Sequence, residues 1–396
     1  MQATVAEIIA AVRSGGDEAI NEYTQRFDTG GGAPAPLIVT EAELDHAVAH
    51  LDASVAAGLR RAIENVATVA AAGSDGASEI PVDLTSHTVL LRCAPVASAA
   101  VYVPAGRAPY PSTAVMGVVA ARVAGVRNIA VCAPPEAGGD VDPVVLGACR
   151  LAGASMVYRM GGAQAIAALA FGTESITGVD VIVGPGNLYV QEAKRQVLGQ
   201  VGIDGFAGPS DVVVIADADA DPQMVALDLL AQAEHGPGTL VAAVSWSSRL
   251  LDGLREPIGA APDTGAVACL VQAADREQAL AFAQAFAPEH LQLVGAQAEA
   301  LAPRATSAGC LFVGAASGTA FGDYIAGSNH ILPTGGTARF HSGLSPEHFL
   351  RRFAEVRIGD AGELARAGAS IARAEGFELH ARSMEARIGN DDDGGR

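Results

Sequence analysis

The chain has 396 residues, a formal net charge of −19, and 25 basic residues against 44 acidic ones. Because a phosphate backbone requires clustered Lys and Arg, this balance argues against nucleic-acid binding, and it favours solubility. No apolar run is long enough to span a membrane, since Arg122 interrupts the longest candidate.

The N-terminal segment predicts an amphipathic helix, because Glu7 interrupts the apolar stretch that a signal peptide would need. The five cysteines are odd in number, far apart and free of C-x-x-C spacing, and they are Cys93, Cys132, Cys149, Cys269 and Cys310. They predict reduced, buried thiols in a cytoplasmic protein, with disulfide or metal roles as the alternatives.

From about residue 97, apolar strand-like runs alternate with helical stretches. One set covers 97–104, 128–135, 155–160 and 179–186, and a second covers 211–217, 239–245 and 311–314. Strands separated by helices indicate βαβ units, so the sequence predicts an α/β fold with two Rossmann-like domains and parallel sheets. Part of the N-terminal region is expected to complete the domain formed by the second set of strands. The stretch after Ser345 is predicted to be helical, and the tail 390–396 to be disordered.

Two glycine-rich turns are candidates for binding a nucleotide, although no G-x-G-x-x-G fingerprint follows a strand. One holds Gln164 after Gly161-Gly162-Ala163, and the other holds Asn187 after Gly184-Pro185-Gly186. Such a turn lets a ligand approach the backbone, and the following helix N-terminus attracts an anion such as pyrophosphate. Tight packing explains such turns equally well, so the pattern leaves a nucleotide site open.

The helix predicted after 211–217 has clear ends, with Asp221 as cap, Pro222 in the first turn and Gly236-Pro237 as the stop. Gln232 and His235 are three residues apart near its end and share one face. A histidine at a helix C-terminus is also favourable for dipole reasons alone, so a structural role stays open.

The pair Glu289-His290 places a carboxylate beside an imidazole, the groups best suited to moving protons near neutral pH. It leads into the alternation of Leu291 and Leu293 and therefore lies at an element junction, where sites often occur. The similar stretch 345–348 is predicted to be only a helix start with a cap and an early proline. An ordinary structural role is the alternative for Glu289-His290 as well.

The segment 322–336 is the densest cluster of polar residues and glycines, and it holds Asp323 and His330. Glu375 and His380 lie five apart near the C-terminus, where a solvated helix face is the alternative. Asp323, His235 and His380 could form a zinc site of nitrogen and oxygen ligands if the fold brings them together. No G-x-S-x-G elbow and no cysteine in an electropositive setting indicates a covalent nucleophile.

Taken together, these segments resemble the histidinol dehydrogenase family over nearly the whole chain. The matching stretches are VYVPAGRAPYPST, GGAQAIAALAFGT, VDVIVGPGNLYVQEAKR, VGIDGFAGPS, LLAQAEHGP, PEHL, GDYIAGSNHILPTGGTARF and the terminal EGFELH. Their order and spacing are shared too, which makes the resemblance more specific than any single motif.

The resemblance implies a homodimer that exchanges small N- and C-terminal helical segments and shares its active sites. It implies an N-terminal segment 1–14 and a first Rossmann-like domain of 15–101 with 210–344, which holds zinc and substrate. A second Rossmann-like domain, 102–209, would bind NAD, and a helical domain, 345–396, would reach the partner's active site.

The resemblance also assigns roles to individual residues, with one Zn²⁺ per subunit and NAD as cofactors. Glu289 and His290 would be catalytic. The zinc ligands would be Gln232, His235, Asp323 and, from the partner chain, His380. The substrate contacts would be these six residues together with Ser210, His330 and Glu375. The NAD contacts would be Tyr102, Gln164 and Asn187.

The implied reaction is the four-electron oxidation of L-histidinol to L-histidine through the aldehyde, the last steps of histidine biosynthesis in the cytoplasm. Three features depart from the family: Asp211 replaces a usual Glu, the loop 317–321 lacks a usual Pro-Glu pair, and the chain is short. The alternatives are a paralogous NAD-dependent dehydrogenase of another small alcohol and a non-catalytic metabolite-binding protein.

Overall fold

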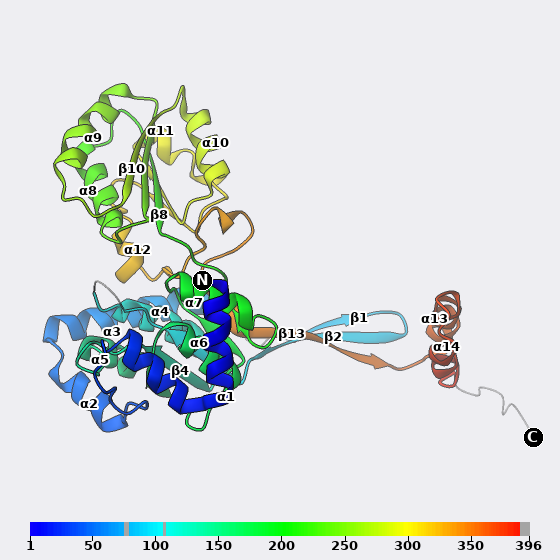
Figure 1. Cartoon of the computed structure of the whole chain (residues 1–396). Coiled ribbons are helices and arrows are strands. Elements are labelled where there is room, and N and C mark those ends of the chain that lie inside the picture. Colours follow the sequence, from blue (N-terminus) through cyan, green and yellow to red (C-terminus); the bar gives the residue numbers. More distant parts are fainter. Residues whose placement is uncertain (75–78, 106–107, 389–396) are drawn as a thin grey trace, which may run out of the picture. The chain divides into compact units, whose positions relative to one another are not determined.

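The computed structural model describes residues 1–74, 79–105 and 108–388, so the tail predicted to be disordered lies outside the described residues. The chain divides into two units, Met1–Ser74 with Val96–Phe349 and Asp75–Pro95 with Leu350–Arg396 (Figure 1). Within the described ranges, no helix combines the length and the apolar character that a membrane crossing requires.

The first unit contains two five-stranded parallel sheets, as the strand pattern predicts. The first sheet has the order β5(Met156–Arg159), β4(Asn128–Ala133), β3(Ser98–Tyr102), β6(Val181–Val183) and β7(Gly202–Ile203). Val101 of the central strand is level with Val131 on one side and Val183 on the other. Counted along the chain this is the order 3-2-1-4-5 of a Rossmann-like sheet.

Helices connect these strands and bury their apolar faces on the sheet. They are α4(Pro111–Ala124), α5(Pro143–Ala152), α6(Gly162–Phe171) and α7(Leu188–Val197). Gly117 of α4 lies so close to β3 that a Cβ at this position would collide with the Val101 side chain. The helix after the first strand therefore packs directly on that strand, as it does in nucleotide-binding Rossmann folds.

The N-terminal helices cover the first sheet. They are α1(Gln2–Phe27), α2(Glu41–His50) and α3(Ala53–Ala72), and they pack on α6 with α7, on α5 and on α4, respectively. Val5, Ile8 and Val12 of α1 recur at helical spacing and are buried in one core cluster with Ile166 and Ile182. The sequence predicts that residues 15–101 belong to one domain with 210–344. The structure corrects this, because α1, α2 and α3 pack against the first sheet and its helices.

The second sheet has the order β10(Val267–Gln272), β9(Leu240–Ser245), β8(Asp211–Ala216), β11(His290–Val294) and β12(Cys310–Val313). Alternate residues of β8 enter two different cores, as expected for a sheet that is covered on both faces. Val212 and Val214 pack with α8(Pro222–Ala233) and α9(Ser248–Ala260), whereas Val213 and Ile215 pack with α10(Arg276–Phe286).

Short elements complete the first unit, and α8 has the ends that the sequence predicts. The Asp221 side chain accepts a hydrogen bond of 2.9 Å from the Gln223 N–H, and Pro222 is the first helical residue. The short helices are α11(Ala296–Glu299) and α12(Ala320–Tyr324), with 3₁₀ turns η1(Ala302–Arg304), η2(Thr337–Arg339) and η3(Pro346–Phe349). The cysteines are free; Cys132 and Cys149 are buried as predicted, whereas Cys93, Cys269 and Cys310 are only partly buried.

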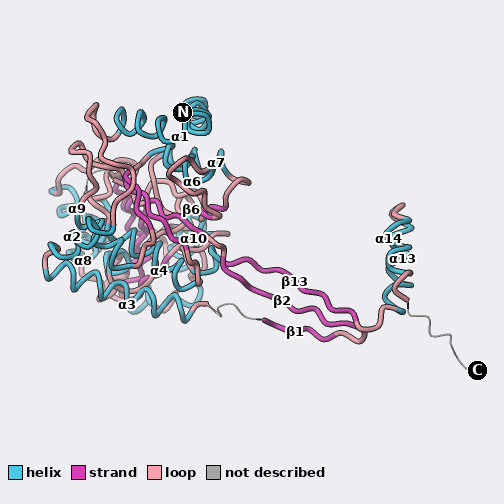
Figure 2. The backbone as a smooth tube through the Cα atoms, turned by 90° about the horizontal axis from the view of Figure 1, so that it is seen from below, coloured by secondary structure: helices cyan, strands magenta, loops and turns pink. Residues whose placement is uncertain are grey.

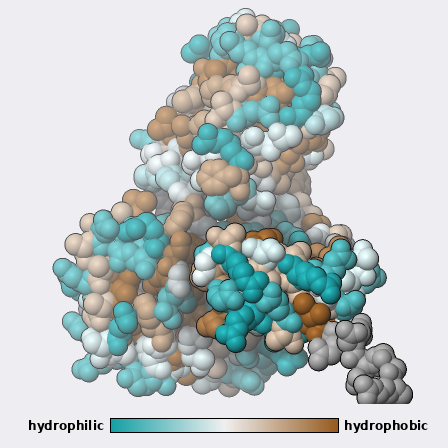
Figure 3. Space-filling view, turned by 90° about the vertical axis from the view of Figure 1, so that its right-hand side faces the viewer, coloured by the Kyte–Doolittle hydropathy of each residue, from teal (hydrophilic) through white to brown (hydrophobic). Residues whose placement is uncertain are grey.

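The second unit is a three-stranded antiparallel sheet and a helical hairpin. The strands, drawn in magenta in Figure 2, have the order β1(Glu79–Asp83), β2(His87–Pro95) and β13(Leu350–Ile358). The hairpin helices α13(Gly362–Ala374) and α14(Glu378–Glu385) pack through Ala369, Ala372 and Ala381. Hydrophilic and hydrophobic side chains are interspersed on the molecular surface in the view of Figure 3.

The prediction of helix throughout 345–396 is wrong for its first part. The segment 345–348 forms a hydrogen-bonded 3₁₀ turn and leads into β13. β13 pairs with β2 along its whole length, from Leu350 opposite Pro95 to Ile358 opposite His87. Cross-strand pairing rather than core burial accounts for this strand, because most of its side chains are exposed.

Lys194 on α7 is the only lysine in the sequence, and its side chain is 1% exposed. Its Nζ lies 2.7 Å from Asp204 Oδ1 and donates a hydrogen bond of 2.6 Å to the Gly184 carbonyl. Asp204 Oδ2 accepts the Gly184 N–H at 2.7 Å. The ion pair therefore fixes both polar backbone groups of Gly184, at a φ of +115° that favours glycine.

Candidate active site

Glu289 and His290 lie where β11 begins, at the amino edge of the second sheet. β11 runs between β8 and β12, and His290 is level with Val212 and Cys310 of these strands. Both side chains are buried, with 6% of Glu289 and 2% of His290 exposed. The predicted junction is therefore a buried acid–base pair at the amino edge of the sheet, between β8 and β12.

Asp211, at the start of the neighbouring strand β8, forms a reciprocal pair with Glu289. The Glu289 N–H donates to Asp211 Oδ1 at 2.7 Å, and the Asp211 N–H donates to Glu289 Oε2 at 3.1 Å. Burial raises the pKa of Glu289 to about 7, although His290, the Asp211 N–H and the Ser210 hydroxyl act in the opposite direction. Near neutral pH this carboxyl can both accept and release a proton.

His290 lies between two carboxylates. Its Nδ1 is 3.7 Å from Glu289 Oε2, and its Nε2 is 3.5 Å from Asp323 Oδ1. Within the described ranges neither ring nitrogen has a hydrogen-bond partner. Burial alone would lower the pKa of His290, but Asp323 and Glu289 raise it by stabilising the imidazolium. The ring can therefore accept a proton in a buried setting.

Asp323 is surrounded by imidazoles. Burial would raise its pKa, but His290, His330 and His235 together lower it, so this carboxylate is ionised near neutral pH. The His330 Nδ1 lies 2.8 Å from the Asp323 carbonyl oxygen, and its Nε2 lies 3.3 Å from Thr113 Oγ1 of α4. Burial lowers the pKa of His330, which favours the neutral ring. The predicted cluster 322–336 thus joins the Glu289-His290 pair.

The end of α8 brings Gln232 and His235 to the same edge of the sheet. Gln232 is 2% exposed, and its Nε2 has no hydrogen-bond partner within the described ranges. Burial lowers the pKa of His235, whereas the charge of Asp323 acts in the opposite direction, and His235 in turn helps to lower the pKa of Asp323. No group of three or more His, Cys, Asp or Glu side chains suited to a metal occurs in the described part of the chain.

Gln232, His235 and Asp323 nevertheless fit part of a zinc coordination shell. An amide oxygen, an imidazole nitrogen and a carboxylate oxygen are ligands of the kind that Zn²⁺ accepts, although an amide is an unusual one. The remaining predicted ligand, His380 on α14, belongs to the second unit, as does Glu375 after α13. Both side chains are exposed, and their assignment to the site stays a prediction.

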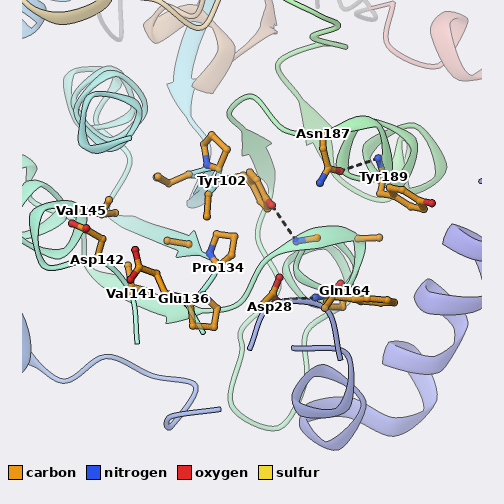
Figure 4. Close-up of a pocket in the computed structure, with 18 of the residues that line it drawn as sticks. Asp28, Tyr102, Pro134, Glu136, Val141, Asp142, Val145, Gln164, Asn187 and Tyr189 are labelled. Carbon is orange, nitrogen blue, oxygen red and sulfur yellow. Dashed lines mark hydrogen bonds between the residues drawn. The ribbon is translucent and has the colours of Figure 1, made fainter. Parts of the chain in front are cut away.

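A cavity of about 890 Å³ lies at the carboxyl edge of the first sheet, and Tyr102, Gln164 and Asn187 all line it (Figure 4). Tyr102 ends β3, and its hydroxyl accepts the Gly162 N–H at 3.0 Å. Asn187 caps α7 by accepting the N–H groups of Tyr189 and Val190 at 3.0 and 3.1 Å. The volume falls in the range of about 300–1,000 Å³ that is typical of small-molecule and cofactor pockets.

Several polar residues of this cavity were not among the predicted site residues. The carboxylates are those of Asp28, Glu136 and Asp142, and the guanidinium is that of Arg26. Asp28 Oδ2 lies 3.4 Å from Gln164 Nε2, and burial raises the pKa of Asp28 to about 6. These residues reach the cavity through the packing of α1 on α6 and through a turn after β4, and no sequence motif marks them.

Two Rossmann-like sheets, a cavity at the carboxyl edge of one and a buried acid–base cluster at the amino edge of the other define an α/β enzyme. The family model for histidinol dehydrogenase matches residues 1–388. The chain therefore belongs to the histidinol dehydrogenase family and is an oxidoreductase of that family.

Individual relatives agree with this assignment. The chain is 43% identical to a histidinol dehydrogenase of Parasynechococcus marenigrum, over 98% of this chain and 91% of the relative. It is 42% identical to one of Geobacter sulfurreducens, over 98% and 93%. A crystal structure of histidinol dehydrogenase from Elizabethkingia anophelis superimposes with a TM-score of 0.91 at 31% identity, covering 98% of this chain and 92% of that chain.

Proposed function

We propose that this cytoplasmic enzyme oxidises L-histidinol to L-histidine through the aldehyde, transferring one hydride to NAD in each of two successive steps. The observation that carries the proposal is the buried pair Glu289-His290, held between Asp211 and Asp323 beside Gln232 and His235. Two oxidations with an intervening hydration need a base for a hydroxyl proton and a base for a water, and this pair supplies both.

His290 accepts the substrate's hydroxyl proton as the hydride leaves, and it acts again on the hydrated aldehyde. The carboxylates of Glu289 and Asp323, 3.7 and 3.5 Å from its ring nitrogens, stabilise the imidazolium that forms. Because the ring is buried, water cannot screen this stabilisation.

Glu289 activates the water that attacks the aldehyde. A buried carboxyl whose pKa is about 7 exists partly as the carboxylate at neutral pH, yet it is basic enough to remove a proton from water. Asp211 and Ser210 hold it in place, which keeps the carboxylate directed at one position. The same environment that makes Glu289 basic thus orients it.

Gln232, His235 and Asp323 would hold a zinc ion, with His380 of the partner chain completing the shell. Bound zinc would orient the amine and imidazole of the substrate for reaction. Ser210, His330 and Glu375 would contact the substrate, Glu375 from the partner chain. The proposal therefore includes a homodimer whose terminal segments complete each other's sites.

NAD would bind in the cavity at the carboxyl edge of the first sheet. This is the edge at which Rossmann-like sheets bind nucleotides, beside the central strands where the strand order reverses. Tyr102, Gln164 and Asn187 line the cavity, together with Gly162 and Ala163 of the first glycine-rich turn.

The test is NADH formation with L-histidinol and with a panel of small alcohols, before and after chelation and zinc add-back. We expect turnover on L-histidinol that chelation abolishes and zinc restores. Preferential turnover of another alcohol would instead identify a paralogous dehydrogenase, an outcome that the altered loop 317–321 makes worth testing. Absence of turnover on every alcohol, together with absence of bound zinc, would indicate a metabolite-binding protein.

A further inference from the structure

The first sheet of this chain offers the nucleotide one carboxylate at a specific position. Along the chain β3 is the first strand of the sheet and β4 is the second, and they are adjacent and parallel. In Rossmann folds that bind NAD, an acidic residue some distance after the turn that follows the first strand accepts a hydrogen bond from the ribose 2′-hydroxyl. Here β4 ends at Ala133, and Pro134-Pro135-Glu136 follows directly.

Glu136 lines the cavity, and its backbone is fixed. The Glu136 N–H donates to the Asp140 carbonyl at 2.8 Å, and the Gly139 N–H donates to the Glu136 carbonyl at 2.8 Å. Asp140 in turn accepts a hydrogen bond of 2.8 Å from Arg159, whose side chain is 1% exposed. The backbone of Glu136 is therefore fixed through hydrogen bonds that lead to the buried Arg159. The side chain of Glu136 itself is exposed.

The other two carboxylates of the cavity are already engaged. Asp142 caps α5 by accepting the Val144 N–H at 2.7 Å, and Asp28 lies 3.4 Å from the amide of Gln164. Glu136 forms no ion pair and no side-chain hydrogen bond within the described ranges, so its carboxylate is available to a ligand. Figure 4 shows Glu136 near Asp142, on the opposite side of Pro134 from Asn187.

We infer that Glu136 determines the dinucleotide specificity of this enzyme, selecting NAD and rejecting NADP. Its carboxylate accepts a hydrogen bond from a ribose hydroxyl of NAD, and it repels the 2′-phosphate of NADP, which carries the same sign of charge. This inference rests on the proposed function, because it assumes that the cavity holds the nucleotide. Glu136 is assigned a role in specificity and none in proton transfer.

The experiment measures dissociation constants of NADH and NADPH for the full-length protein by nicotinamide fluorescence, so that no turnover is needed. We expect the wild type to bind NADH more tightly. Glu136→Gln should reduce the ratio of the NADPH to the NADH dissociation constant roughly 10- to 100-fold, which is the range expected for one charged hydrogen bond. Glu136→Arg should reduce it further, because a guanidinium pairs with phosphate.

Glu256→Gln is the matched control. Glu256 is exposed on α9 beside the second sheet, and its replacement changes the net charge equally without changing the cavity. This variant should keep the wild-type ratio. Because the turn at Glu136 uses only backbone atoms of that residue, Glu136→Gln should also keep the wild-type melting temperature.

Two results would overturn the inference, and they can be told apart. If NADH binds and Glu136→Gln leaves the ratio unchanged, the role of Glu136 is wrong while the proposed function stands. If neither nucleotide binds the wild type, the assignment of the cavity is wrong, and the role of Glu136 fails with it.

Discussion

Asp211 and Glu289 exchange hydrogen bonds between their backbone N–H groups and their carboxylates, at 2.7 and 3.1 Å, across two adjacent parallel strands. Asp211 is one of the positions at which the resemblance to the family leads one to expect a different residue, a Glu. The shorter side chain reaches the Glu289 N–H directly from the first residue of β8. The substitution is thus accommodated within the pair that positions the base.

The pH dependence of the second oxidation should follow Glu289. Because burial raises its pKa to about 7, the carboxylate form and the rate of aldehyde oxidation should rise with pH through that value. Asp211→Asn removes a negative neighbour, so it should lower the pKa of Glu289. The rising part of the pH–rate profile, here called the rising limb, should then move to lower pH. Asp219→Asn, at an exposed position beyond the same strand, is the control and should leave the limb unchanged. A limb that does not move in Asp211→Asn would contradict this coupling.

The ionisation of Glu289 should also affect the free energy of unfolding. This free energy should fall with pH over the range in which the rate of aldehyde oxidation rises. A buried carboxyl with a raised pKa favours the folded state when protonated, so its contribution is complete below about pH 4.5 and is lost as pH rises through about 7. The free energy of unfolding of the wild type, relative to Glu289→Gln, should therefore fall over this interval. Denaturant unfolding at a series of pH values measures it, and a flat difference would argue against a raised pKa.

Glu289 and His290 should separate the two chemical steps. Glu289→Gln should spare alcohol oxidation more than aldehyde oxidation, since only the second step needs an activated water. His290→Ala should impair both steps, each by roughly 10²- to 10⁴-fold. Single-turnover NADH formation, started from the alcohol and from the aldehyde, distinguishes the two variants. Our assignment of roles would be wrong if Glu289→Gln slowed only the first step.

Complementation tests whether subunits share a site. A dimer of one His235→Ala chain and one His380→Ala chain has one intact site, if His380 acts on the partner. Random subunit exchange should therefore restore about a quarter of the wild-type activity from two inactive variants. Mass spectrometry of differently tagged chains verifies the exchange. No recovery after verified exchange would rule out sharing.

The buried ion pair of Lys194 and Asp204 should contribute to stability through Gly184. Lys194→Met leaves Asp204 buried without a cation and should cost about 3–5 kcal/mol in the free energy of unfolding. The double variant Lys194→Met, Asp204→Asn should recover part of this loss, because the amide oxygen can still accept the Gly184 N–H. Denaturant unfolding of both variants provides the comparison, and a double variant no more stable than the single one would contradict this account.

Strand pattern and capping residues were sufficient to predict two parallel sheets and most of their strands, but not β7 or β10. The apolar runs beginning at 97, 128 and 211 became β3, β4 and β8, because parallel strands covered on both faces are continuously apolar. The ends of α8 were readable for a similar reason, since Asp221 and Pro222 act locally. The sheet β1-β2-β13 was not predicted, because its side chains are largely exposed and its stability depends on pairing between distant segments.

The candidate site could be assembled from the sequence only by resemblance. Glu289-His290 stood out as a local motif, but nothing local connects it with Asp211, which lies 78 residues earlier in the chain. Glutamine is an unusual zinc ligand, so the spacing of Gln232 from His235 was not informative alone. Asp28 and Glu136 carry no motif, because their places in the cavity come from the packing of α1 and from the strand order.

The single lysine has a practical consequence for measuring local opening of this protein. Because the Lys194 amine is buried in its ion pair, acylating reagents can reach it only when the segment around Gly184 and α7 opens. No other lysine competes for the reagent. The rate at which the Lys194 amine becomes modified therefore measures how often the segment around Gly184 and α7 opens.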